Sequence, residues 1–167
     1  PFMLEELNIT KTEGGLIASW NFFGYLCGSL LSISSIFKKK VKLVFFISIV
    51  LSISTTFLMS IGDEVIFFII VRFMSGLSSA FVLIFGTALI LPSIQAFGKK
   101  SLSTSHFMGV GFGIVISSIL VTILGDLGFH WNELWIGVAL LSVILAIPIF
   151  IYTPNETLPN SYSPNSN

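Results

Sequence analysis

Charge is scarce in this sequence. Only 10% of its 167 residues are charged, and 8 Lys and Arg balance 8 Asp and Glu, so the formal net charge is zero. Because the basic residues form no patch with interleaved aromatics, the chain lacks the electrostatic footprint of a nucleic-acid-binding protein, and we expect no nucleic acid partner. Hydrophobic residues make up 54% of the chain and the mean hydropathy is +0.97, well outside the usual balance of a soluble domain. The composition therefore predicts an integral membrane protein that has the lipid bilayer as a partner.

Cysteine is almost absent as well, since Cys27 is the single one. The chain can therefore form neither an internal disulfide nor a thiolate metal site. No His, Cys, Asp or Glu cluster has the spacing of metal ligands, and no serine, histidine and acid are spaced as a catalytic set. We expect no metal, no cofactor and no enzymatic activity.

Long apolar runs, by contrast, are abundant. A transmembrane helix needs about 17–25 predominantly apolar residues. Barrel strands would be shorter and would alternate in polarity, whereas these runs are continuous, so we predict an all-α bundle over residues 1–152. The tail 153–167 is rich in Pro, Asn and Ser and is predicted to be a disordered linker or terminus. The five predicted transmembrane helices are 16–37, 43–61, 65–91, 107–124 and 134–152.

Lysine positions predict the orientation of the bundle. Short cytoplasmic loops retain Lys and Arg, and six of the 8 basic residues lie in the loops 38–42 and 98–101. We therefore place both loops and the C-terminal tail in the cytoplasm of a multi-pass protein of the cell (inner or plasma) membrane. The N-terminal segment then lies outside, although Pro1–Leu7 has no signal-peptide pattern. One further span before Pro1 would explain this arrangement, and we expect such a segment to be missing.

The first predicted span carries small and polar residues on one helical face. Asn21, Gly24, Tyr25 and Gly28 recur at three- and four-residue spacing. Glycines spaced in this way let another helix backbone approach closely, which favours a packing role for Gly24 and Gly28. Asn21 and Tyr25 need hydrogen-bond partners or a wet cavity at such depth, so they are candidates for substrate or proton coupling as well as for packing.

The third predicted span contains an arginine. Arg72 precedes Gly76 and Ala80 on the same face, about 10 Å along the helix from Val65. An arginine inside hydrocarbon costs on the order of 2.5–3.5 kcal/mol, so it usually has a partner or a function. Its long side chain could instead reach the outer interface. The small residues one turn below favour a position facing the bundle interior, although the residues alone leave both interpretations open.

The fourth predicted span begins with alternating glycines. Gly109, Gly111 and Gly113 are typical of a helix segment that bends or packs closely. They are not a nucleotide-binding loop, because no strand precedes them and they open a transmembrane helix.

The arginine block also carries a family resemblance. The pattern Arg72-x-x-x-Gly76-x-x-x-Ala80 resembles the fourth-helix signature of the major facilitator superfamily of secondary transporters. The segments SWNFFGYLCGSL at 19–30, RFMSGLSSAFVLIF at 72–85 and HFMGVGFGIVISSIL at 106–120 resemble its YbfB/YjiJ-type branch. One departure lies in the loop after the first span, where the family usually has an Asp before its basic residues and this chain has none.

The resemblance implies twelve helices in two halves, with a midplane substrate cavity and alternating access. The five spans then correspond to helices two to six of the N-terminal six-helix half. The missing first helix and the C-terminal half would be partners of this chain. Within that scheme Arg72 matches an arginine implicated in proton coupling or anionic-substrate binding, and Asn21 and Tyr25 would face the cavity.

The predicted function is secondary active transport of a small solute by alternating access, with this chain as a partial transporter. The resemblance implies that this transport is coupled to protons. A rival prediction of another class is a non-transporting membrane scaffold or assembly subunit, in which Arg72 holds neighbouring helices together by hydrogen bonds.

Overall fold

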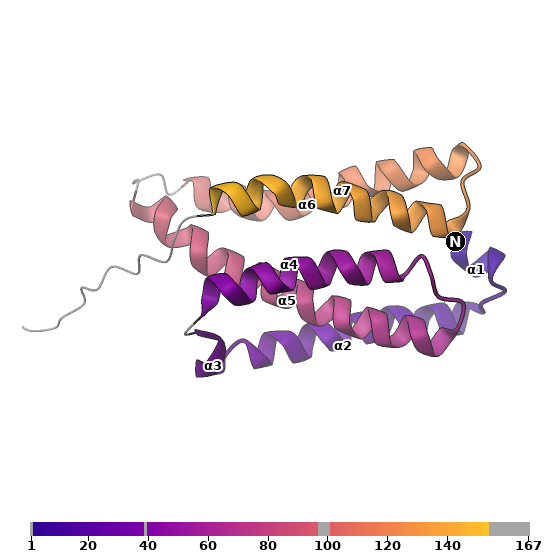
Figure 1. Cartoon of the computed structure of the whole chain (residues 1–167), viewed down its shortest axis with the longest axis horizontal. Coiled ribbons are helices and arrows are strands. Elements are labelled where there is room, and N and C mark those ends of the chain that lie inside the picture. The colour runs from indigo at the N-terminus through magenta and orange to yellow at the C-terminus, as the bar shows by residue number, and fades with distance from the viewer. Residues whose placement is uncertain (1, 39, 97–100, 154–167) are drawn as a thin grey trace, which may run out of the picture.

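All regular structure in the described part of the chain is helical. The computed structural model describes residues 2–38, 40–96 and 101–153. Figure 1 shows the long helices lying along the long axis of the molecule, with the short helices α1 and α3 at opposite ends. The predicted all-α class is confirmed for these residues. The helices are α1 Phe2–Glu6, α2 Lys11–Leu31, α3 Ser35–Lys38, α4 Val41–Leu58, α5 Val65–Ala96, α6 Ser101–Asp126 and α7 Trp131–Tyr152.

Four of these helices are long and apolar enough to cross a membrane. They contain the candidate spans Val41–Leu58, Val65–Pro92, Phe107–Asp126 and Trp131–Tyr152, which match the last four predicted spans. The predicted tail beyond Thr153 and most of the loop 98–101 lie outside the described residues.

The first predicted span, 16–37, differs from the structure. Helix α2 begins earlier, at Lys11, and ends at Leu31, where the chain turns before α3. Helix α2 is also not among the four apolar spans. Its glycines and polar residues make it less hydrophobic than the other long helices, which are richer in Leu, Ile and Phe. The structure therefore supports a multi-pass helical protein with four candidate spans, and a fifth crossing by α2 stays a prediction.

Helices α2 and α5 approach each other backbone to backbone. A Cβ added at Gly24 would collide with the carbonyl oxygen of Phe73, and one added at Gly76 would collide with the carbonyl oxygen of Asn21. At Gly28 an added Cβ would lie 2.7 Å from the Leu77 carbonyl oxygen. Only glycine permits this approach, which is how helices gain contact in a medium that offers no hydrophobic drive between them. The same interface buries Ala80 completely, beside Gly28.

Aromatic side chains hold α4 against α5 and α7. Phe45, Phe81 and Phe85 belong to one buried cluster, which Ala146 of α7 completes together with Ile49. Offset or tilted ring pairs of this kind add to the free energy gained from burial. This cluster fixes α7 relative to α5 through α4, and so positions the N-terminal half of α7 near Arg72.

Helix α6 is the exception to this packing. In its span Phe107–Asp126 no residue is buried, and a Cβ added at Gly109, Gly111 or Gly113 would meet nothing within 4 Å. Its contact with α7 includes Leu124, whose side chain lies close to Gly137. Within the described residues the three glycines therefore contact no other helix, and their role in packing or bending stays a prediction.

Candidate functional site

A cavity of about 530 Å³ lies among helices α1, α2, α5 and α7. Its wall includes Arg72 from α5 and Asn21 from α2, which the close approach of these two helices brings to the same space. Lys11 from the start of α2 is a second cation in the lining, and Trp135 contributes an aromatic wall from α7. No Asp or Glu is among the described residues that line this cavity. The space is therefore walled by two positive charges, an amide and apolar side chains.

Arg72 extends from α5 towards α7. The central carbon of its guanidinium, Cζ, lies 4.6 Å from the centroid of the Trp135 ring. A guanidinium over an indole face is attracted by the negative π-electron density of the ring. A guanidinium that lies over an aromatic ring can still donate hydrogen bonds from its edge.

The guanidinium nitrogen Nε has no partner within the described residues. This atom is buried and makes no hydrogen bond there. A buried donor left without an acceptor costs about 1–3 kcal/mol, and more when the group is charged. Pairing this donor with an acceptor would lower the free energy of the protein, and a negatively charged acceptor would lower it most.

The structure brings together only two of the three residues predicted for substrate or proton coupling. Arg72 and Asn21 line the same cavity. Tyr25 lies one turn after Asn21, is 37% exposed and does not belong to that lining. The contribution of each residue to coupling is a matter for experiment and stays a prediction.

The sequence patterns did not assign two residues of this cavity to the site. Trp135 is at an expected position for an interfacial aromatic, and Lys11 counts towards the charge balance, but neither pattern links them to Arg72. The link exists because α7 packs against α4 and lies beside α1. Spacing along one helix identifies a face, whereas contacts between helices distant in sequence leave no periodic signal.

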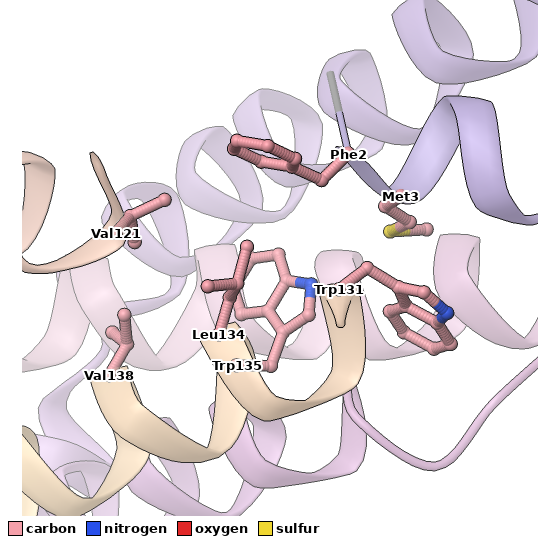
Figure 2. Close-up of a pocket in the computed structure, with 7 residues that line it drawn as sticks. All are labelled: Phe2, Met3, Val121, Trp131, Leu134, Trp135 and Val138. Atoms are coloured by element: carbon pink, nitrogen blue, oxygen red, sulfur yellow. The ribbon is translucent and has the colours of Figure 1, made fainter. Parts of the chain in front are cut away.

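A second cavity, of about 200 Å³, adjoins the first. Figure 2 shows it between Phe2 and Met3 of α1, Val121 of α6 and the first turns of α7. Its described lining includes no charged side chain, and it shares Met3 and Trp135 with the larger cavity. The remaining lining residues, all from α7, are Trp131, Leu134 and Val138.

Helix α1 is attached to the start of α7 by one carboxylate. Glu6 Oε1 accepts a hydrogen bond of 3.0 Å from the backbone N–H of Trp131, and Glu6 Oε2 lies 3.0 Å from His130 Nδ1. A carboxylate is favoured at this position because the first N–H groups of a helix have no partner within it and carry partial positive charge. The attachment holds Phe2 and Met3 over the second cavity.

These features define a multi-pass helical membrane protein with a cationic cavity between its helices. The family model described as "Uncharacterised MFS-type transporter YbfB" matches residues 1–166. Because this match covers nearly the whole chain, the chain belongs to that family of major facilitator superfamily transporters. No curated protein and no solved structure matches the chain. The family prediction based on Arg72, Gly76 and Ala80 is confirmed, and the family consists of transporters of the membrane rather than enzymes.

Proposed function

We propose that this chain forms one part of a secondary active transporter that moves a small solute by alternating access, coupled to a proton gradient. Family membership supports transport across a membrane, and the state of Arg72 supports the location of the site. A half-buried cation whose Nε is buried and unpaired, on the wall of a cavity of about 530 Å³, is suited to bind a solute or to respond to one. This observation carries the proposal.

The roles of the cavity residues follow from their chemistry. Arg72 binds the solute or couples it to proton movement, and Asn21 offers both a donor and an acceptor across the same space. Tyr25 joins them only if α2 rotates or a further helix extends the cavity towards it. The glycines of the α2–α5 interface keep these two walls together as one body during the motion.

The remaining parts of the proposal concern assembly and orientation. Helices α2, α4, α5, α6 and α7 correspond to helices two to six of one six-helix half. A first helix and a second half complete the cavity, and the glycines at 109, 111 and 113 provide bending or contact with those parts. The loops 38–42 and 98–101 and the C-terminal tail face the cytoplasm.

Proton movement in proteoliposomes tests the proposal. The protein, expressed in its native coding context, is reconstituted with an enclosed pH-sensitive dye and exposed to a panel of small solutes. We expect solute-dependent proton movement, reduced at least tenfold by Arg72→Ala and partly retained in Arg72→Lys, at equal membrane abundance. Lys42→Ala is the matched control, because the Lys42 ammonium also lies near a ring, 5.7 Å from the centroid of Phe46, but does not line the cavity.

A membrane scaffold is the second candidate, and the contact between Arg72 and Trp135 favours it. This contact joins α5 to α7 without any solute. If joining these helices is the function of Arg72, Arg72→Ala lowers the amount of protein in the membrane, and no solute moves protons in the wild type. That pair of results contradicts the transport proposal.

A further inference from the structure

Trp135 stands between the two cavities, and this position indicates the kind of solute that the site takes. Resting on the transport function proposed above, we propose that the apolar cavity of Figure 2 is a second subsite and that the solute is an organic anion. Its carboxylate pairs with Arg72 in the larger cavity, and its apolar body passes Trp135 into the smaller one.

The charge of the larger cavity selects the head group. Arg72 and Lys11 are positive, and the described lining holds no carboxylate to neutralise them. A guanidinium presents parallel N–H donors that match the two oxygens of a carboxylate. The Nε of Arg72 has no acceptor among the described residues. A hydrogen bond from Nε to a carboxylate oxygen would therefore satisfy an unpaired donor without breaking an existing hydrogen bond. A cationic head group offers this donor no acceptor, and a neutral carbonyl oxygen would accept only a weaker hydrogen bond than a carboxylate does.

The smaller cavity selects the body. Its volume of about 200 Å³ is bounded by aliphatic and aromatic side chains and a methionine, and the two indole N–H groups are the polar side-chain groups among its described lining residues. Binding pockets of this kind gain affinity by removing apolar surface from water. Met3 and Trp135 belong to both linings, so the two spaces adjoin at these residues.

Another cavity of similar size shows that an apolar space alone does not make this site. It measures about 250 Å³ and is lined by Ser19, Trp20 and Phe23. No cation lines it. The Trp135 cavity, in contrast, adjoins the half-buried guanidinium of Arg72, and this pairing of charge with apolar volume is the basis of the proposal.

Equilibrium dialysis tests the head group. Radiolabelled 3-phenylpropanoate is dialysed against the full chain in nanodiscs of zwitterionic lipid, which removes lipids of net negative charge as competitors for the site. We expect saturable binding that Arg72→Gln weakens at least tenfold and Arg72→Lys weakens less. Lys42→Gln should leave the affinity within twofold. The matched amide and amine, 3-phenylpropanamide and 3-phenylpropylamine, should compete at least tenfold more weakly than the unlabelled acid.

A cavity-filling variant tests the body independently of the arginine. Val138→Phe fills the smaller cavity and should weaken binding of 3-phenylpropanoate about tenfold, while propanoate, which lacks the ring, changes less than twofold. Val143→Phe is the control, because Val143 also lies on α7 but is 43% exposed and lines neither cavity. Equal losses for both acids in Val138→Phe would overturn the second subsite.

The results separate this inference from the transport proposal. Dialysis needs no gradient, so binding that depends on Arg72 without proton-driven uptake contradicts transport and supports the anion site. Competition by the amine that equals that of the acid overturns the anion site, even if proton-driven transport of another solute is then observed. No detectable binding of 3-phenylpropanoate to a folded wild type also overturns it.

Discussion

The α2–α5 interface and the exposed face of α6 carry the same sequence signature and have opposite structural surroundings. Gly24 and Gly76 face backbone at a distance that admits no Cβ, whereas Gly109, Gly111 and Gly113 meet nothing within 4 Å. Small residues at helical spacing therefore identify a surface that permits close approach, but they do not identify the partner. In this chain one such surface is used internally, and the other is open to whatever lies beside α6.

The largest expected effect falls on the α2–α5 interface. Gly76→Ala would place its methyl group against the Asn21 carbonyl oxygen, and α2 cannot yield because backbone rather than a flexible side chain blocks the way. We expect a destabilisation of at least about 1–3 kcal/mol, the usual cost of overpacking. Thermal unfolding in detergent, followed by size-exclusion chromatography, measures it. Gly111→Ala is the control and should leave the unfolding temperature unchanged or slightly raised, since alanine favours helix more than glycine does.

A second variant tests whether the exposed glycine face of α6 has a function. Gly111→Leu should leave the thermal stability of this chain unchanged, because no described neighbour is close enough to clash. If the glycines contact or bend against the rest of a transporter, the same variant reduces solute-dependent proton movement several-fold. Unchanged stability with unchanged proton movement would show that the glycines on α6 serve neither purpose.

The smallest effect concerns the ordered start of α2. The Thr10 hydroxyl, and then the Thr10 backbone N–H, donate to the Glu13 carboxylate and lower its pKa below the ordinary value of 4.5. Since the folded pKa is the lower one, the stabilisation is present above about pH 4.5 and is lost as the pH falls through the folded value. The hydrogen-exchange protection of the first turn of α2, corrected for the intrinsic pH dependence of amide exchange, should therefore fall slightly below pH 4.5 and should not change in this range in Glu13→Gln. The exposed face of α6 should show no such change.

Most of the helices were predictable from the sequence, and the site only in part. Continuous apolar runs predicted the four candidate spans, because their length and composition suffice to define a transmembrane helix. The end of α2 at Leu31 was not predicted, since apolar residues continue past it through the turn into α3. Arg72 and Asn21 were identified by their cost in an apolar helix, which a single sequence reveals.

Trp135 and Lys11 could not be placed by the same reasoning. Arg72 and Trp135 lie on helices separated by the whole of α6, and no pattern along either helix records that their side chains meet. The meeting depends on the aromatic cluster that fixes α7 against α4 and on the carboxylate of Glu6 that attaches α1 to α7.

The sequence by itself determined that this protein is a helical membrane protein, because a chain this apolar must satisfy its backbone hydrogen bonds within each crossing segment. It also determined that one of those segments contains an arginine, which needs a partner or a function at that position. Only the tertiary structure decided that the arginine lies over Trp135 at the boundary of two cavities, and that one glycine face is buried while the other is open. Those outcomes depend on which helices become neighbours, and that is settled by the packing of whole helix surfaces rather than by the spacing of residues along any one of them.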